Sequence, residues 1–159
     1  MKIAFTGPSG AGKTTLAKKL SETYKIKLVT SVASERAYLS PEMQTLHVTA
    51  RFMDLLASGE PFVSDRWFFD NLIYAKIQGF PRIYLKMLEY LIDFAFNQGV
   101  KVFYVPHPLG STQNDVFNNL LLAELKSYNS KVVRLEGIGV DERLEFVKNY
   151  LKKREKKKN

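Results

Sequence analysis

The sequence predicts an α/β domain in three layers, α/β/α, built around a five-stranded and mostly parallel sheet. Short apolar runs, each suited to one buried strand, recur at residues 2–6, 26–30, 61–65, 100–105 and 131–136. Segments of helical period separate these runs, and strands that alternate with helices form right-handed βαβ units with helices on both faces. The chain has 159 residues, 45% of them hydrophobic, which suits one domain with a substantial core.

The first strand and the first helix flank a glycine-rich loop. The apolar run KIAFT (2–6) is the strand, and it ends where the glycines begin. Leu16, Leu20 and Tyr24 then recur at helical spacing, which predicts a helix over residues 13–24. The run IKLVT that follows is the predicted second strand.

A second helix is predicted to begin at Ser40, a favourable N-cap residue that is followed by a proline in the first turn. Gly59 ends it. Its apolar residues line one face: Met43, Leu46, Ala50, Met53 and Ala57. Its polar residues line another: Gln44, His47, Arg51, Asp54 and Ser58. The third strand, PFVSD, follows directly.

The second half of the chain continues the alternation. Helices are predicted over 68–77 and 82–98, separated by the breaker QGFP. The second of these helices is mostly apolar, and its polar residues predict one narrow hydrated stripe on an otherwise buried helix: Arg82, Lys86, Glu89, Asp93 and Asn97. A polar loop (106–115) precedes a helix over 116–128, and a last helix begins near residue 141.

The positive charge of the chain is concentrated at its end. The formal net charge is +8, and the tail (152–159) carries +5 of it, from six basic residues and Glu155. We predict one domain over residues 1–151 followed by this basic tail. The tail is either a frayed, solvated helix end or a weak contact for nucleic acid.

Composition excludes several kinds of site. The chain has no cysteine, which excludes disulfides and cysteine metal ligands. The sequence has no run of 18 apolar residues, so no membrane span is expected. A cytoplasmic location fits these features best.

Residues 7–14, GPSGAGKT, match the pattern G-x-x-x-x-G-K-[ST] of a phosphate-binding loop. Glycines let successive backbone N–H groups turn toward phosphate oxygens, and the helix that follows adds its positive end. Lys13 is predicted to reach the β- and γ-phosphates, and the Thr14 hydroxyl to bind Mg²⁺. The predicted ligands are ATP and Mg²⁺, and the predicted nucleotide site comprises Gly7, Pro8, Ser9, Gly10, Ala11, Gly12, Lys13, Thr14 and Thr15.

A second group of candidate residues lies in the block DRWFFD, directly after the third strand. Ligands of such sheets bind beyond the carboxyl ends of the strands, which places Asp65 opposite the phosphates and the metal; the alternative is a helix-capping carboxylate. Arg66 either binds substrate phosphate or pairs with a neighbouring acid. Asp70 is either functional or a plain surface carboxylate. The aromatic residues between them either stack on a base or belong to the core.

A third group follows the second strand. Glu35 and Arg36 lie near the carboxyl end of that strand, in a segment without strong periodicity, where a loop should flank the acceptor. The alternative is a salt-bridged helix end. We also include Arg51 in the predicted acceptor site.

These features resemble the P-loop nucleoside and nucleotide kinases, and within them the small single-domain branch around ribosylnicotinamide kinase domains and phage-type nucleotide kinases. The resemblance rests on three stretches: GPSGAGKT, QTLHVTARFMDLLASG and PFVSDRWFFDNLIYA. It covers residues 1–80 well and the remainder by the order of its elements. It implies the P-loop NTPase fold with strand order 2-3-1-4-5, and phosphoryl transfer from ATP–Mg²⁺ to a small nucleotide-like acceptor.

The resemblance also implies roles for individual residues. Lys13, Asp65 and Arg66 would be catalytic, and Thr14 and Asp65 would hold the metal. Residues 137–143 would pass near the adenine. The acceptor would contact Glu35, Arg36, Arg51, Arg66 and Asp70.

The loop after the fourth strand departs from this family. Such kinases close an arginine-rich lid there, whereas residues 106–130 contain no arginine and only Lys126. Either Arg66, Arg82 or Arg36 supplies the missing charge, or the lid works differently, or catalysis is weak.

The predicted function is ATP-dependent phosphoryl transfer to a nucleoside or nucleoside monophosphate. One alternative is a polynucleotide 5′-hydroxyl kinase that uses the basic tail. Another is a non-kinase NTPase that acts on a partner. The chain is expected to be a monomer or a homodimer.

Overall fold

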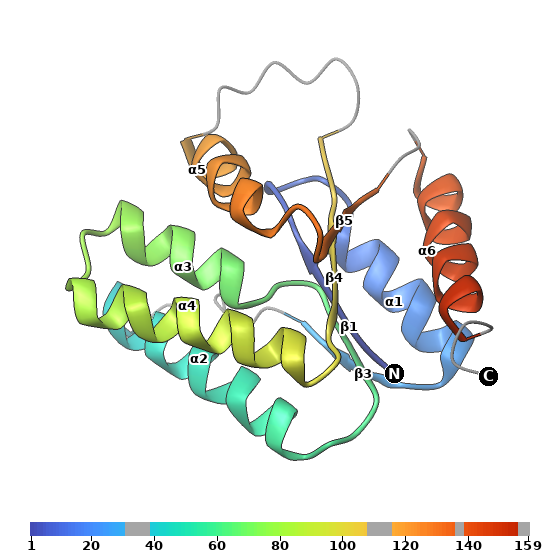
Figure 1. Ribbon diagram of the computed structural model, residues 1–159, viewed down its shortest axis with the longest axis horizontal. Helices are drawn as coiled ribbons and strands as arrows, with labels where there is room; N and C mark the ends of the chain where they lie inside the picture. The colour runs from blue at the N-terminus through green and yellow to red at the C-terminus, as the bar shows by residue number, and fades with distance from the viewer. Residues whose placement is uncertain (31–38, 108–115, 136–138, 156–159) are drawn as a thin grey trace.

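The computed structural model describes residues 1–30, 39–107, 116–135 and 139–155. Its sheet has the strand order β2-β3-β1-β4-β5, and every pairing is parallel (Figure 1). The strands are β1 (Lys2–Thr6), β2 (Lys27–Val29), β3 (Phe62–Ser64), β4 (Lys101–Tyr104) and β5 (Val132–Arg134). The structure therefore confirms the predicted fold class and the predicted strand order.

Helices cover both faces of the sheet (Figure 1). One face carries α1 (Lys13–Tyr24) and α6 (Val140–Glu155). The other face carries α2 (Pro41–Ala57), α3 (Phe68–Ile77), α4 (Arg82–Asn97) and α5 (Val116–Leu125), which a 3₁₀ turn (Lys126–Tyr128) extends. Alternate residues of β1 face opposite layers, so Ala4 joins one core while Ile3 and Phe5 join the other.

The structure confirms where α2 begins and shows which of its faces is buried. The Ser40 hydroxyl accepts a hydrogen bond from the Met43 N–H at 3.3 Å, so Ser40 is the N-cap. The buried residues of α2 are Thr45, Thr49, Phe52, Leu55 and Leu56. The apolar face predicted from the sequence is instead turned outward, with Met43, Leu46 and Met53 exposed. The Phe52 ring fills the core against Trp67, which fixes this rotation of the helix.

Helix α4 is less buried than its sequence suggested. Leu88, Leu91, Ile92 and Ala95 pack into the core. A second apolar row is exposed, however, and the prediction of a single hydrated stripe on a buried helix is wrong: Ile83, Met87, Tyr90 and Phe94. The cause is the position of α4 in the outer layer, where only one side of the helix has a neighbour to cover it.

The aromatic residues after β3 belong to the core. Trp67, Phe68 and Phe69 have no exposed surface, and Trp67 packs against Phe62 with ring centroids 5.4 Å apart. They anchor the start of α3 beneath the carboxyl end of the sheet. Of the two predicted roles, these aromatic residues therefore have the one in core packing, not in stacking on a base.

The last predicted helix continues into the start of the basic tail. Helix α6 extends to Glu155, so the first residues of the predicted tail are helical, while residues 156–159 lie outside the described part. Among the described residues, no helix combines the length and the hydropathy that a membrane span requires.

Candidate active site

The loop between β1 and α1 is shaped by two glycines at its ends. Gly7 has φ +147°, and a Cβ there would lie 2.3 Å from the Val105 carbonyl oxygen, so the loop can pass β4 only with glycine at this position. Gly12 is the left-handed N-cap of α1 at φ +89° and offers no side chain to the helix. The first turn of α1 therefore has no side-chain cap and presents its N–H groups to the loop.

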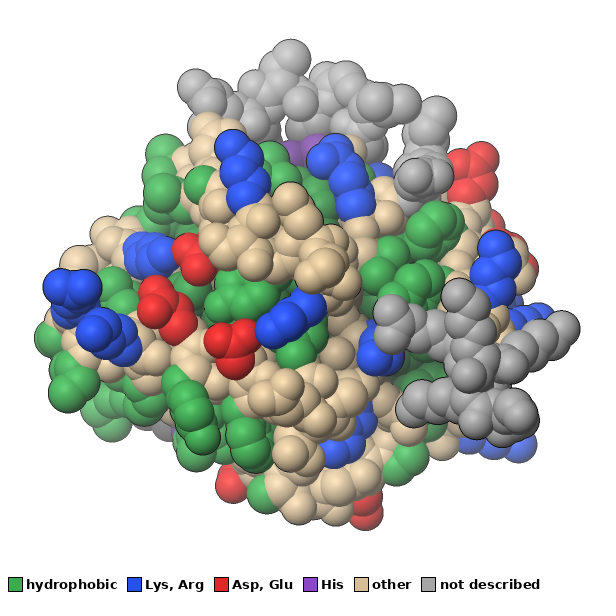
Figure 2. Space-filling view, viewed as in Figure 1, with side chains coloured by type: hydrophobic (Ala, Val, Ile, Leu, Met, Phe, Trp, Pro, Cys, Tyr) green, Lys and Arg blue, Asp and Glu red, His purple; other side chains and the backbone are tan. Residues whose placement is uncertain are grey.

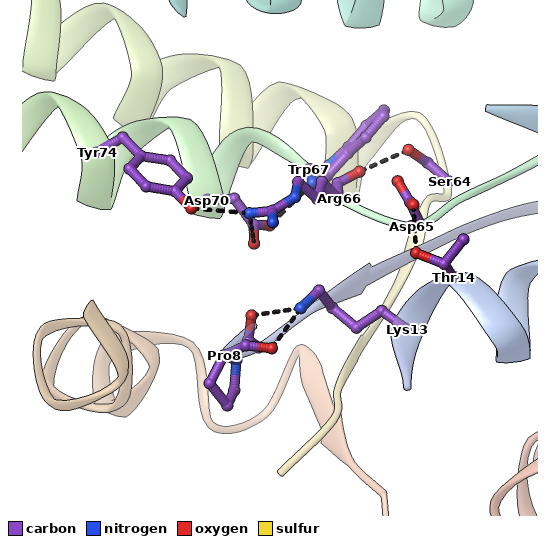
Figure 3. A network of polar contacts seen from close by, with 10 residues as sticks. Pro8, Lys13, Thr14, Ser64, Asp65, Arg66, Trp67, Asp70 and Tyr74 are labelled. Atoms are coloured by element: carbon purple, nitrogen blue, oxygen red, sulfur yellow. Dashed lines mark hydrogen bonds and ion pairs between the residues drawn. The ribbon is translucent and has the colours of Figure 1, made fainter. Parts of the chain in front are cut away.

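Lys13 lies inside this loop. Its side chain is buried, and its Nζ donates hydrogen bonds to the carbonyl oxygens of Gly7 at 2.7 Å and Pro8 at 2.6 Å (Figure 3). The ammonium is thereby held at the centre of the loop, at the position where phosphate oxygens would gather. Ser9 and Gly10 form the exposed rim of the same loop.

Thr14 and Asp65 meet across the sheet edge. The Thr14 hydroxyl donates a 2.8 Å hydrogen bond to Asp65 Oδ2, although 51 residues separate the two in sequence (Figure 3). Asp65 is nearly buried, and its N–H donates to the Val29 carbonyl at the end of β2. A hydroxyl and a carboxylate side by side are oxygen donors of the kind that Mg²⁺ prefers, so the pair fits that ion.

Arg66 is held in place by three groups. Its guanidinium donates to Tyr74 Oη at 3.1 Å and lies 3.9 Å from Asp70 Oδ1. Its main-chain carbonyl accepts a bond from the Ser64 hydroxyl at 2.6 Å. Burial acts to lower the pKa of Arg66, but Asp70, Tyr74 and Asp65 outweigh it and hold the pKa above its usual range. Arg66 is therefore a fixed cation at the edge of the site.

Asp70 has no exposed surface, which rules out the alternative of a surface carboxylate. Its Oδ2 accepts a 3.0 Å bond from the Trp67 N–H and so caps the first turn of α3. Burial raises the pKa of Asp70 above its usual range, even though the charges of Arg66 and Lys13 act in the opposite direction. Figure 3 shows the carboxyl group between these two cations.

A cavity of about 240 Å³ opens beside Arg66 between α2 and α3. Its walls combine amide, hydroxyl and apolar groups: Pro41, Gln44, Thr45, Val48, Arg66, Asn71, Tyr74 and Gln78. The Asn71 amide is fixed by a 3.0 Å hydrogen bond to Thr49 Oγ1, which itself lies 3.3 Å from Tyr84 Oη. A small concave site with a few fixed polar groups is the usual form of a ligand pocket.

The structure thus brings together Lys13, Thr14, Asp65, Arg66 and Asp70. Of these, the sequence predicts the place of Asp65 opposite the phosphate-binding loop, at the carboxyl end of its strand. Arg51 does not line this cavity; it lines a separate one of about 160 Å³ between α2 and β2, together with Lys27 and Asp54. Glu35 and Arg36 lie outside the described residues, as does most of the loop at 106–115.

Arg143 is a residue that sequence reasoning missed. From α6 its guanidinium donates to the Ala11 carbonyl at 2.9 Å and to the Pro106 carbonyl at 3.1 Å. It therefore ties the phosphate-binding loop to the start of the loop after β4. The one feature of the sequence that points to Arg143 is its position in GIGVDER, the segment expected near the adenine. The sequence does not indicate which carbonyl groups its side chain reaches.

The chain is similar to several nucleoside and nucleotide kinases. Deoxyguanosine kinase of Bacillus subtilis (strain 168) is 29% identical over 46% of this chain, and the match spans less than half (44%) of that relative. Two solved structures share the fold. Deoxyadenosine kinase from M. mycoides with dCMP and dCDP bound has a TM-score of 0.65 at 15% identity, covering 96% of this chain and 99% of its own. The NadR protein in complex with NAD and AMP-PNP has a TM-score of 0.62 at 18% identity, covering 92% of this chain and 47% of its own.

A family profile, the AAA domain, matches residues 2–143. That range contains the phosphate-binding loop, all five strands and the Thr14–Asp65 pair. The protein therefore belongs to the AAA domain family and has the fold of the P-loop nucleoside and nucleotide kinases.

Proposed function

We propose that the protein is an ATP-dependent kinase that phosphorylates a nucleoside or a nucleoside monophosphate. One observation carries the proposal: Arg66 lines the small cavity, directly follows Asp65 of the Thr14–Asp65 pair, and shares with Lys13 of the phosphate-binding loop an electrostatic interaction with Asp70. A phosphoryl donor and an acceptor bound in these two places would meet at Arg66. The similarity to deoxyguanosine kinase and the AMP-PNP complex of NadR support the same reaction class.

In this proposal each residue acts by position and charge, because phosphoryl transfer requires little covalent work from the protein. Lys13 would leave the Gly7 and Pro8 carbonyls and bind the transferring phosphoryl oxygens. Thr14 and Asp65 would hold Mg²⁺, which neutralises charge on the phosphates when bound. Arg66, fixed by Asp70 and Tyr74, would orient the acceptor. It would also balance negative charge on the transferring phosphoryl group, a task for which the loop after β4 has no arginine.

The walls of the cavity favour a single nucleoside unit as the acceptor. A volume of about 240 Å³ lies slightly below the roughly 300–1,000 Å³ of most ligand pockets, which leaves room for a small ligand only. The amides of Gln44, Asn71 and Gln78 offer both donors and acceptors, which suits the polar edge of a base. We place such an enzyme in the cytoplasm, where ATP and Mg²⁺ are available.

An acceptor panel with matched arginine variants tests the proposal. ADP release is measured with ATP–Mg²⁺ and each of the common nucleosides, nucleoside monophosphates and a 5′-hydroxyl oligonucleotide. We expect one or a few of the nucleosides or nucleoside monophosphates to stimulate ADP release. Arg66→Ala should reduce kcat/KM for that acceptor by roughly 100-fold or more, as for other groups that stabilise transferring charge. Arg51→Ala, in the neighbouring cavity, should leave it nearly unchanged.

Three results would contradict the proposal. Phosphorylation of the oligonucleotide alone would identify a polynucleotide kinase. ADP release that needs no acceptor and rises with a protein or DNA would identify an NTPase that acts on a partner. Equal activity losses in the Arg51 and Arg66 variants would show that the cavity beside Arg66 is not the acceptor site.

A further inference from the structure

A further cavity, of about 310 Å³, opens between the end of α5 and the edge strand β5. Its volume falls within the roughly 300–1,000 Å³ of most ligand pockets. Among the described residues it shares no lining side chain with the cavity beside Arg66 or with the phosphate-binding loop. Its lining residues come from β4, α5, the 3₁₀ turn that extends α5, and β5: Tyr104, Leu122, Leu125, Lys126, Asn129, Val132 and Arg134.

The register of the sheet brings the walls of this cavity together. Tyr104 of β4 pairs with Arg134 of β5, so Arg134 and Val132, two residues before it, lie on the same face of the sheet as Tyr104. Opposite this face lies α5, which the Lys76–Glu124 ion pair holds against α3. The cavity is the space between that helix and the edge of the sheet, and Figure 1 shows how the turn after α5 leads into β5 there.

The floor of the cavity is apolar and its rim is basic. Leu125 is buried, Leu122 and Val132 are half-buried, and Lys126 and Arg134 are exposed. Within the described part of the chain, no acidic side chain lines the cavity and neither cation has an ion pair. In Figure 2 basic side chains lie near the top of the view, over α5 and the end of β5, with apolar surface between them. This combination suits a ligand with an apolar body and an anionic end.

Arg134 is already positioned for such a ligand. Its guanidinium lies over the Tyr104 ring, 5.5 Å from the centroid, and the Tyr104 hydroxyl donates a 2.9 Å hydrogen bond to Asn118 Oδ1. The ring is therefore fixed from both strand and helix, and the cation above it is restricted in turn. A guanidinium that lies over a ring still presents its N–H donors, and it can bind two oxygens of one anion at once.

We propose that this cavity is a second ligand site, and that it binds an organic phosphate, a phosphate monoester with an apolar body. Such a group carries about −1.5 to −2 charge at pH 7, which matches the two positive charges of Lys126 and Arg134. A carboxylate supplies only one negative charge, and inorganic phosphate leaves the apolar floor unfilled. The ester alone uses both halves of the cavity, and the site is separate from the proposed donor and acceptor sites.

Isothermal titration calorimetry with 1-naphthyl phosphate tests the site on the full chain. The protein is titrated with and without saturating AMP-PNP–Mg²⁺, which is expected to occupy the phosphate-binding loop. We expect one probe molecule per chain in the cavity, with a Kd that AMP-PNP leaves unchanged. Lys126→Ala and Arg134→Ala should each raise this Kd about 10-fold, as for the loss of a hydrogen bond to a charged group. Inorganic phosphate and 1-naphthoate should each bind at least about 10-fold more weakly than the ester.

Two matched variants serve as controls. Lys86→Ala removes an exposed lysine of α4, and Arg66→Ala removes the cation of the other cavity; both should leave the Kd of the probe unchanged. Far-UV circular dichroism confirms that each variant is folded, which is expected at Lys126 and Arg134 because both side chains are exposed.

Several results would overturn this second site. A probe that does not bind, or that AMP-PNP displaces, would show that the cavity is no separate site. A loss in Arg66→Ala equal to that in Arg134→Ala would place the probe beside Arg66. An equal loss in Lys86→Ala would indicate general attraction to positive charge. Inorganic phosphate or 1-naphthoate that binds as tightly as the ester would contradict the proposed ligand class.

Discussion

Asp70 combines complete burial with an acidic side chain at the centre of the site. Burial raises its pKa, and the charges of Arg66 and Lys13 do not fully compensate. The ionised form of this carboxylate therefore costs folding free energy. In return it holds the Arg66 guanidinium at 3.9 Å beside the cavity and caps α3. Active sites commonly trade stability for a fixed charge in this way.

The first prediction concerns Asp70→Asn, which keeps the shape and the bond from the Trp67 N–H but removes the charge. A group whose folded-state pKa is raised destabilises the fold above that pKa, and the cost disappears below the unfolded pKa. The variant should therefore have a higher Tm than the wild type at pH 7, and the difference should vanish below pH about 4. Phosphoryl transfer should nevertheless fall, because Arg66 loses its ion pair. Thermal melts at both pH values measure this.

The matched control is Asp54→Asn on the exposed side of α2, which should leave Tm unchanged at either pH. A Tm for Asp70→Asn that is lower than wild type by the same amount at pH 7 and pH 4 would show that the charge of Asp70 stabilises nothing and costs nothing, and that its role is packing alone.

For individual residues, the sequence predicts those contacts that follow from a local motif and from the order of the strands. Lys13, Thr14 and Asp65 meet because a motif fixes two of them and the carboxyl end of β3 fixes the third. The burial of Asp70 and the reach of Arg143 to Ala11 and Pro106 could not be predicted. Both depend on how separate elements approach in three dimensions, which local spacing does not encode.

Among the elements, α2 has the clearest local determinant. Its N-cap, Ser40, begins the helix that supplies Gln44, Thr45 and Val48 to the cavity. The Ser40 hydroxyl satisfies the Met43 N–H, which would otherwise lack a partner within the helix.

The second prediction is that Ser40→Ala lowers the free energy of unfolding by about 1 kcal/mol, the usual effect of removing an N-cap. Ser40→Asp should retain most of the stability because its carboxylate can accept the same bond and complements the helix dipole. Urea unfolding of the three proteins provides the comparison. Equal stability of the alanine and aspartate variants would contradict the capping role.

Helix α2 also shows that the periodicity of apolar residues does not by itself predict which face of a helix is buried. The sequence gives it one apolar row and, a third of a turn away, the residues Phe52, Leu55 and Leu56. Both arrangements are compatible with an amphipathic helix, and only the shape of the core around Trp67 selects between them. Helix α4 has the same ambiguity, and in both helices the second apolar row is the exposed one.

For the whole molecule, the sheet order determines how the site is assembled. β1 lies between β3 and β4, so the loop after β1 meets Asp65 after β3 on one side and Val105 after β4 on the other. The cavity lies on the β3 side, between α2 and α3. A donor at the loop and an acceptor in the cavity would therefore face each other across Arg66, an arrangement suited to direct transfer.

Mass spectrometry of the acceptor measures this transfer most directly. The protein is incubated with ATP–Mg²⁺ and the nucleosides and nucleoside monophosphates, and each acceptor is then weighed. The account predicts that one acceptor gains a single phosphoryl group, that ADP appears in equal amount, and that Lys13→Ala reduces the product roughly 100-fold or more while remaining folded. ATP that is consumed without any acceptor gaining mass, or a Lys13→Ala variant with full activity, would contradict it.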